Sequence, residues 1–414
     1  MKKFAIILLL LMANLAHAYD VTVDTSERDI NADPTRGRGL IVYQDPDRVL
    51  RIWGRVDSAY MNISHVGTAD KSAGVFLNAG EKTPIIGFKF YQNLEDNWTT
   101  GLRFDAQVMT SDGSTGNGAS SGTDNKIWAQ YAYWWIYNPD YGRLTVGRQD
   151  GVEYTAMKYA DARPGYNFGS ALTYYTDGSY FGGSATAKTG MTSLDGSNQV
   201  SSSFRYDSPK FHDVSFAYHY IPGNTAGSMD YSSRQAWGMF YRPKTGWDQG
   251  LSLAYGENVI HNATGQLVGR SSTYGGNYQF DDKKALVAAG YTQWSNPSLA
   301  ENVTYSKYHM WQTSAKYFIT PRFDISGGRY ALYDDGVKDN KSTQYVVGVE
   351  YYLSKSIMVY ANWAKIDNQG NMGFAPYGPG SGSLNSLSTY YPQATVKIPG
   401  QDITATMVGF SIEF

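Results

Sequence analysis

Apolar and polar residues alternate along much of the chain with a period of two, which is the pattern of β-strands with one apolar and one polar face. In 102–108 the polar positions are Arg103, Asp105 and Gln107, and apolar residues stand between them. The segment 345–353 repeats the alternation, with an apolar residue at every second position. Such strands can place one face in an apolar medium and the other in water, so we expect an all-β fold.

Sixteen segments with strand character are bounded by turn residues, which predicts sixteen strands. They are 50–63, 83–91, 98–109, 125–137, 141–150, 199–207, 211–221, 234–242, 249–257, 270–280, 284–295, 307–318, 321–332, 343–353, 356–366 and 402–414. Most are close to the ~9–11 residues with which a tilted strand crosses a bilayer.

The connections between these segments alternate in length. Short turns alternate with long, polar, glycine-rich loops, among them 64–82, 110–124, 151–198 and 367–401. Seven short turns and eight long loops place both ends of the series on the short-turn side. This is the layout of an outer-membrane barrel with short periplasmic turns and long external loops. We therefore predict a 16-stranded antiparallel transmembrane β-barrel.

The N-terminus has the features of an export signal. Lys2 and Lys3 precede an apolar run over 4–12, and Ala16-His17-Ala18 offers the small residues of a cleavage site. A membrane helix needs ~20 apolar residues, and this run is too short. We predict a signal peptide over 1–18, an N-terminal extension over 19–49 that is flexible or periplasmic, and the barrel over 50–414.

The composition fits an exported barrel. The chain has 35 Tyr, 10 Trp, 44 Gly and no Cys; aromatic residues suit strands and membrane interfaces, and a chain without cysteine has no disulfides. Without Lys2 and Lys3, the 35 basic residues fall to 33 against 37 acidic ones, a charge of −4. This balance gives no support to nucleic-acid binding, which usually requires a basic surplus.

Signatures of enzymes and metal sites are poor. The six histidines show no zinc-ligand spacing, and neither a nucleophile elbow nor a phosphate-binding glycine loop is present. The acidic pairs Asp281-Asp282 and Asp334-Asp335 stand in loops, where turn chemistry explains them. We expect no catalytic residue, no metal and no cofactor.

Four motifs carry a resemblance to a known family. They are Asp140–Tyr154, which contains Gly147-Arg148-Gln149-Asp150-Gly151-Val152-Glu153-Tyr154, then Arg205–Pro209, Gly348–Tyr360 and the closing Val408–Phe414, which ends in an aromatic residue. In this order they resemble the general porins of Gram-negative outer membranes, and together they span most of the mature chain. The resemblance implies a homotrimer of sixteen-stranded barrels in contact with outer-membrane lipid and lipopolysaccharide.

In that family the third loop folds inward and places acidic residues opposite basic residues of the wall. The resemblance implies that 151–198 is this loop and that Asp161 matches its aspartate. Asn167 replaces the family's glutamate, with two residues inserted, and Arg55 stands where the family has a lysine. The family's other wall arginines fall on non-basic residues, namely Ile85, Trp128 and Asn198. Ion selectivity therefore cannot be transferred from the family.

We expect the residues that line or narrow the pore to be charged or polar residues of the wall and of the third loop. The candidates are Asp161, Glu153, Arg163, Asn167, Arg55, Arg103, Asp105 and Arg148. The alternative for Asp161 is a solvated loop charge, and Arg103 and Asp105 could simply pair with each other. Arg148 shares the phase of Leu144 and Val146, which favours the lipid side unless it lies at the wet end of its strand.

The function we predict is a water-filled outer-membrane channel for passive diffusion of small hydrophilic solutes and ions. One alternative is a substrate-selective porin for sugars or oligosaccharides, in which tyrosine and tryptophan rings form a stacking track; interface girdles are the simpler explanation of those residues. A second alternative is a barrel enzyme or a secreted all-β hydrolase that uses two carboxylates.

Overall fold

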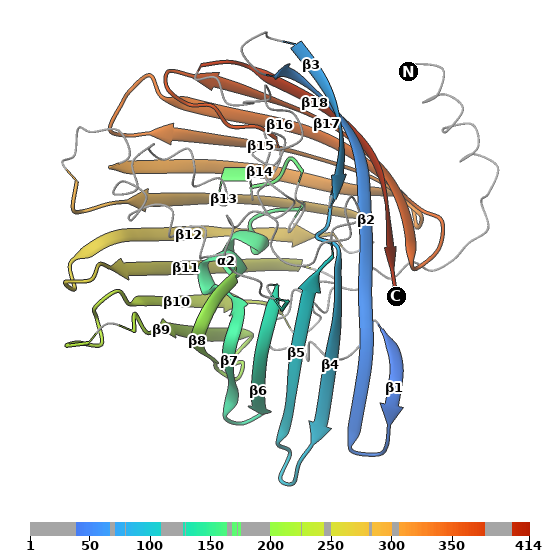
Figure 1. The fold of residues 1–414 in the computed structure, drawn as a ribbon, viewed down its shortest axis with the longest axis vertical. Helices are drawn as coiled ribbons and strands as arrows, with labels where there is room; N and C mark the ends of the chain where they lie inside the picture. The colour runs from blue at the N-terminus through green and yellow to red at the C-terminus, as the bar shows by residue number, and fades with distance from the viewer. Residues whose placement is uncertain are drawn as a thin grey trace.

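The computed structural model describes residues 39–66, 71–78, 80–108, 127–128, 130–163, 168–171, 173–174, 199–224, 226–243, 250–280, 284–299, 306–376 and 400–414. Sixteen antiparallel strands form a closed barrel, as predicted (Figure 1). In ring order they are β2 (Arg48–Val66), β4 (Ile85–Asn93), β5 (Thr99–Gln107), β6 (Tyr131–Asn138), β7 (Gly142–Asp150), β8 (Gln199–Asp207), β9 (Val214–Ile221), β10 (Arg234–Tyr241), β11 (Gly250–His261), β12 (Leu267–Gln279), β13 (Ala285–Ser295), β14 (Lys307–Thr320), β15 (Phe323–Asp334), β16 (Lys341–Tyr352), β17 (Ile357–Gln369) and β18 (Ile403–Glu413).

The ring closes between its last and first strands. β18 pairs with β2 from Ala405 opposite Ile63 to Glu413 opposite Arg55. The terminal Phe414 exchanges backbone hydrogen bonds of 2.9 and 3.0 Å with Gly54. The closing strand predicted from the C-terminal sequence is therefore confirmed, and the barrel has no free edge at this seam.

Two further strands were not predicted. β1 (Leu40–Gln44) lies in the segment predicted as an extension and pairs with β2 from Val49 to Ile52. The pairing of the C-terminal strand with β2 stops at Gly54, opposite Phe414. The edge of β2 before Gly54 therefore has no partner from β18, and β1 pairs with it instead. β3 (Lys71–Asn78) lies in the predicted loop 64–82. β3 pairs with β2 over Ser58–Val66, whereas β4 pairs with the same edge of β2 over Arg48–Arg55.

The predicted strand 125–137 begins too early. β6 starts at Tyr131, and Ile127 and Trp128 form a turn. The Trp128 ring lies 5.8 Å from the rings of both Phe88 and Phe104. Trp128 therefore packs against β4 and β5 from a turn. Its aromatic side chain has strand character in the sequence, so the alternation alone placed the start of the strand too early.

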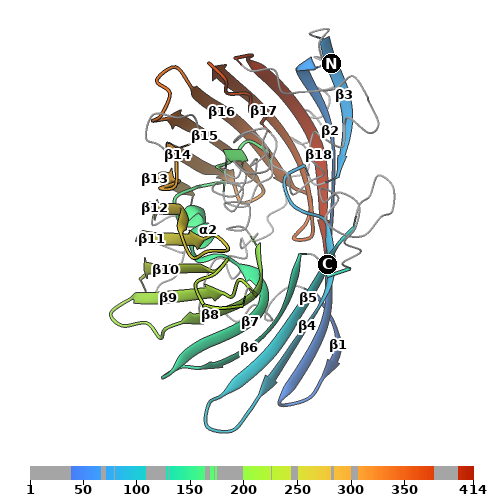
Figure 2. The same ribbon diagram turned by 60° about the vertical axis from the view of Figure 1, so that its left-hand side comes forward.

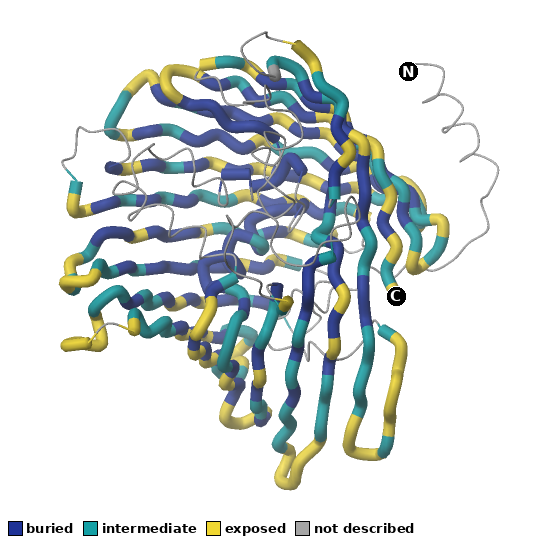
Figure 3. Tube along the Cα trace, in the orientation of Figure 1, coloured by how far each residue is buried: buried dark blue, intermediate teal, exposed yellow. Residues whose placement is uncertain are grey.

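Exposure alternates along the strands as the sequence pattern predicts (Figure 3). In β8, Phe204 is 48% exposed, whereas Arg205 is 6% exposed and Asp207 3%. β9 repeats this, with Phe216 exposed and His219 buried. In these strands large apolar side chains face outward and polar ones face the lumen, which is the arrangement of a barrel in lipid. In the described residues, no helix has the length and apolar character required to cross a bilayer.

Candidate functional site

A short helix lies against the inner face of the barrel wall. α2 (Val152–Tyr159) follows β7 directly and packs on β10, β11 and β12 (Figures 1 and 2). The wall makes room for it with glycines: a Cβ on Gly256 would lie 2.9 Å from the Cβ of Ala156, and one on Gly275 would lie 2.5 Å from that of Ala160. A larger side chain at either glycine would push the helix away from the wall.

Apolar contacts fix α2 on this side. Val152, Ala156 and Tyr159 form one buried cluster with four inward-facing side chains of β9, β10 and β11, which are Ala217, Ala236, Phe240 and Ala254. Glu153 accepts a hydrogen bond of 2.5 Å from the Ser271 hydroxyl and one of 3.4 Å from Thr273. Burial raises the pKa of Glu153 to about 7, because the two hydroxyls replace only part of its hydration.

Beyond α2 the chain runs along the inner wall from β12 towards β17, and polar wall side chains bind its backbone. Asn277 donates to the carbonyl of Tyr159 at 2.9 Å, and Gln312 donates to that of Ala160 at 2.9 Å. The Ser314 hydroxyl accepts from the amide of Ala162 at 2.7 Å. Amide and hydroxyl side chains that face inward on these strands therefore hold the segment in place.

Asp161 is a structural anchor in this arrangement. Its carboxylate accepts from the amide of Arg163 at 2.9 Å, the amide of Ala171 at 3.1 Å and the hydroxyl of Tyr330 at 2.8 Å. The side chain is 1% exposed. It ties two points of the loop to β15, as a buried carboxylate with three donors does.

Arg163 joins the loop to two wall strands and to a second inward segment. It donates to Ser326 on β15 and, at 3.0 Å, to the Asn362 side-chain oxygen on β17. The Asn362 amide in turn donates to Glu81 at 2.8 Å. Glu81 stands between β3 and β4, so Asn362 connects the segment 80–84 with the loop.

An apolar cluster covers the inner wall near the loop end of the barrel. Phe168, Ala171 and Tyr174 of the loop are fully buried against inward-facing residues of β14–β18 and β2. Examples from the wall are Tyr308, Met310, Leu332, Val346, Ile366, Met407 and Met61. We call the inner face of β12–β17, with the described loop residues 159–163, 168–171 and 173–174 on it, the strapped wall.

The opposite part of the lumen is basic and aromatic. Lys89, Arg103, Arg143 and Arg205 face inward on β4, β5, β7 and β8, and we call this set with its partner rings the basic wall. The Lys89 ammonium lies 3.7 Å from the centre of the Trp53 ring, the Arg103 guanidinium 4.1 Å from that of Tyr131, and the Arg143 guanidinium 4.8 Å from that of Trp135. Cation–π attraction stabilises each pair.

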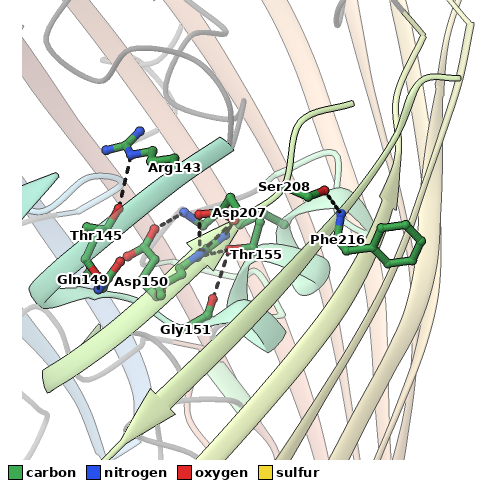
Figure 4. A network of polar contacts seen from close by, with 11 residues as sticks. Arg143, Thr145, Gln149, Asp150, Gly151, Thr155, Asp207, Ser208 and Phe216 are labelled. Atoms are coloured by element: carbon green, nitrogen blue, oxygen red, sulfur yellow. Dashed lines mark hydrogen bonds and ion pairs between the residues drawn. The ribbon is translucent and has the colours of Figure 1, made fainter. Parts of the chain in front are cut away.

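Two carboxylates accompany these four cations. Asp105 pairs with Arg103 at 2.6 Å and accepts from the Trp53 indole at 2.8 Å. Asp207 pairs with Arg205 at 2.8 Å. Arg205 also donates to Thr155 of α2 at 3.3 Å and so connects the two sides. Figure 4 shows how Thr145, Gln149 and Asp150 of β7 lead into Gly151 and Thr155 beside Asp207.

Away from the basic wall, the buried charged side chains of the lumen include four carboxylates. Asp57, Glu81, Asp324 and Glu350 are buried there, and Lys316 lies 3.1 Å from Asp324 and 3.0 Å from Glu350. Asp57 and Glu81 bind Tyr360 and Asn362 of β17, so buried carboxylates gather on β15–β17 and the residues that contact them. Among the residues that the structure describes, no group of three or more His, Cys, Asp or Glu side chains could hold a metal ion.

Comparison with known proteins agrees with this architecture. A family model described as Gram-negative porin matches residues 6–371. The chain belongs to the Gram-negative porin family. Its function is that of the family, an outer-membrane channel for passive diffusion. No curated protein matches the sequence significantly.

Solved porin structures share the fold at low sequence identity. The anion-selective porin from Comamonas acidovorans has a TM-score of 0.68 and 15% identity, over 89% of this chain and 100% of that one. The Salmonella typhi OmpF complex with daunomycin has a TM-score of 0.59 and 16% identity, over 91% and 100%. The trimer form of in-vitro folded OmpT, an outer-membrane protein of Vibrio cholerae, has a TM-score of 0.57 and 12% identity, over 89% and 100%.

The structure places the candidate residues of the porin in different environments. Asp161, Arg163 and Glu153 lie on the strapped side and are buried, and each binds the wall. Arg103 and Asp105 face the lumen and pair with each other. Asn167 lies outside the described residues.

Arg55 and Arg148 occupy other positions. Arg55 donates to the carbonyl of Thr83 at 3.0 Å and lies 3.4 Å from Glu413. Arg148 faces the same side as Leu144, which is 39% exposed, and donates to the Ser201 hydroxyl at 2.8 Å. The structure thus places Arg148 on the outer face and not with the lumen residues, because the β7 alternation continues through Gly147.

Several residues of the site were not recognised from the sequence. They are the wall residues that bind the loop and the cations of the basic wall, namely Gln312, Ser314, Asn277, Asn362, Lys89, Arg143 and Arg205. For Lys89, Arg143 and Arg205, the alternation within the predicted strands already indicated that their side chains face the lumen. The residues that bind the loop are far from it in sequence, and a local pattern such as alternation does not predict contacts of this kind.

Proposed function

We propose that 151–198 is the loop that narrows this porin, and that solutes cross between it and the basic wall. The support is the contact pattern of the described loop residues, which bind β10–β17 through α2, Asp161 and Arg163. On β4–β7 the inward-facing groups include the cations Lys89, Arg103 and Arg143, each of which lies over an aromatic ring.

The channel then favours small anions over cations. The single observation that carries this proposal is that four inward cations of the basic wall are accompanied by two carboxylates, Asp105 and Asp207. Charges in a low-dielectric wall bias the ions that pass close to them. Anion selectivity is stated for the Comamonas acidovorans porin, whose fold this chain shares.

The test is the zero-current potential of the purified porin in a planar bilayer across a KCl gradient. We expect the sign that chloride permeation produces, and a potential of the opposite sign would contradict the proposal. Asp105→Asn should increase the anion preference, because it removes a lumen carboxylate beside Arg103. The reverse shift would also count against it.

A second candidate is a channel selective for aromatic anions in place of sugars. The observation that favours it is the set of rings paired with cations, Trp53, Tyr131 and Trp135, which offers stacking beside positive charge. Benzoate and cyclohexanecarboxylate have the same charge and similar size, so their relative permeabilities isolate the contribution of the ring. Equal permeabilities would exclude this candidate.

We further propose that the porin is a homotrimer, exported with a signal peptide that ends at Ala18, and that it catalyses no reaction. The trimer form of the Vibrio cholerae protein with the same fold supports the assembly. Light scattering in detergent should yield three chains per particle, and N-terminal sequencing should begin at Tyr19. A monomer, or an intact N-terminus in the outer membrane, would refute the respective part.

A further inference from the structure

The barrel wall carries an insertion beside β2. β3 and β4 lie one after the other along the same edge of β2 (Figure 1). The last pair of β3 with β2 is Asn78 with Ser58, and the first pair of β4 with β2 is Ile85 with Arg55. Between these two pairs β2 has two residues, whereas the opposite segment has six. The excess is larger than the single extra residue of a β-bulge, so this segment has to leave the ladder.

The described part of the insertion, residues 80–84, lies on the inner face of the barrel. The Asp57 carboxylate, which faces inward from β2, accepts from the amide of Glu81 at 3.3 Å and from that of Lys82 at 3.2 Å. The Glu81 side chain is fully buried and accepts from the Asn362 amide on β17. Because β2 and β18 separate this segment from β17, Glu81 reaches across the inner face of both strands.

The wall is shaped to hold the segment. The Tyr360 hydroxyl donates to Asp57 at 2.7 Å, and a Cβ on Gly409 of β18 would collide with that hydroxyl. A Cβ on Gly80 would collide with it from the other side. Glycine at both positions therefore lets the phenol and the segment approach each other closely. Pro84, which has no amide hydrogen for a strand partner, ends the insertion, as proline does at interruptions of a sheet.

Lys82 presents a charge to the lumen. Its side chain is 25% exposed, and its ammonium lies 3.1 Å from the carboxylate of Glu413, which faces inward near the end of β18. Arg55 lies 3.4 Å from the same carboxylate and donates to the carbonyl of Thr83 at 3.0 Å. Glu81 is thus turned to the wall and Lys82 towards the water.

The segment meets the third loop at Asn362. The Asn362 side chain accepts from Arg163 of the loop at 3.0 Å and donates to Glu81 at 2.8 Å. Asp57, which holds the segment, pairs with Ser411 near the C-terminal end of β18, on the short-turn side of the barrel. The loop enters from the opposite end, after β7. A solute from outside therefore passes the loop first and 80–84 afterwards.

We propose that 80–84 forms a second constriction of the channel, on the periplasmic side of the loop, and that Lys82 is the charge that solutes meet there. The two inward segments then act as resistances in series. A fixed charge has most influence where the passage is narrow and the surroundings have a low dielectric constant. This second constriction rests on the channel function of the family and not on the ion preference proposed above.

The first test is the single-channel conductance of the full porin in a planar bilayer. Asp57→Ala leaves two amides and the Tyr360 hydroxyl without their acceptor, so the segment should detach and the conductance should rise by about 1.5-fold. Asp57→Asn, which keeps an acceptor oxygen, is the control and should lie nearer the native value. Asp161→Ala, which releases the loop, is measured in parallel. The two decreases in resistance should add in the double variant, because the constrictions lie in series.

An unchanged conductance in Asp57→Ala, with a native melting temperature in detergent, would overturn the second constriction. An unchanged conductance in Asp161→Ala alone would instead count against the loop, so the two failures are distinguishable.

A thiol at the tip of the segment decides the question if Asp57→Ala does not fold. A bulky neutral thiol reagent should reduce the conductance of Lys82→Cys by about half, because the added group occupies a narrow part of the lumen. Lys365→Cys is the matched control, since Lys365 faces outward with the exposed Trp363, and its modification should leave the conductance unchanged. Mass spectrometry measures the modification of both variants. A thiol at position 82 that does not react, or that reacts without a change in current, would contradict the proposal.

Discussion

The strapped wall and the basic wall are built from the same kind of strand, yet they use their inward-facing positions differently. On the strapped wall, glycine, serine, asparagine and glutamine receive the loop, as Gly275, Ser314 and Asn277 do. On the basic wall, arginine and lysine lie over aromatic rings, as Lys89 lies over Trp53. One wall therefore fixes the position of the loop, and the other supplies the charge that ions meet.

The largest effect should follow from removing the anchor of the strapped wall. Asp161→Ala leaves two buried amides and the Tyr330 hydroxyl without their acceptor, a loss of about 3 kcal/mol or more in loop docking. We expect a higher and noisier single-channel conductance. Asp161→Asn, which keeps an acceptor oxygen, is the control and should lie between the native porin and the alanine variant. An unchanged conductance in Asp161→Ala would show that Asp161 is not the anchor.

A second prediction concerns the groove for the loop. In Gly275→Val the new Cβ meets the Cβ of Ala160 at 2.5 Å and a wall carbonyl at 2.7 Å, so the loop must shift, at a cost of about 1–3 kcal/mol. The conductance should rise and the melting temperature in detergent should fall. Gly327→Ala, whose nearest contact is 3.1 Å, is the matched control. Equal conductance and melting in both variants would argue against close packing at Gly275.

A third prediction concerns the basic wall. Lys89→Gln with Arg143→Gln removes two inward cations and should reduce the chloride-to-potassium permeability ratio severalfold, since each charge contributes about 1 kcal/mol at close range in water. Zero-current potentials across a KCl gradient measure this ratio. Arg270→Gln, on the outer face, should leave it unchanged. A ratio that moves with Arg270 and not with the inward pair would place the selectivity elsewhere.

The smallest effect concerns pH. Burial raises the pKa of Glu153 to about 7, with a further contribution from Glu257 in the same direction, while the hydroxyls of Ser271 and Thr273 act against it. The docked loop favours the neutral carboxyl, so its stabilisation is complete below the ordinary pKa of a glutamate and is lost as the pH rises through about 7. Most of the loss falls between the ordinary pKa and pH 7, and between pH 7 and 8 the remaining loss is about 0.4 kcal/mol. Current fluctuations should increase over this interval in the native porin and not in Glu153→Gln; an equal increase in both would assign the effect to another group.

Much of the barrel was predictable from the sequence because alternation is a local property. It located the sixteen strands of the ring and the inward phase of Arg103 and Asp105. It missed β1 and β3, since both depend on where distant strands end along β2. The role of Asp161 was also hidden, because its partner Tyr330 is far away in sequence and only the closed barrel brings them together.

The proposed channel requires that the loop occupies the strapped wall and leaves the basic wall to the solutes. The porin has no cysteine, so a single introduced thiol reports on each side. Tyr91→Cys places a thiol beside the Trp135 ring on the basic wall, and Ser342→Cys places one on β16, where the native hydroxyl contacts Tyr174 of the loop. A charged thiol reagent added to the open channel should rapidly reduce the current of Tyr91→Cys and leave that of Ser342→Cys unchanged. A rapid block of Ser342→Cys with no effect on Tyr91→Cys would contradict the account.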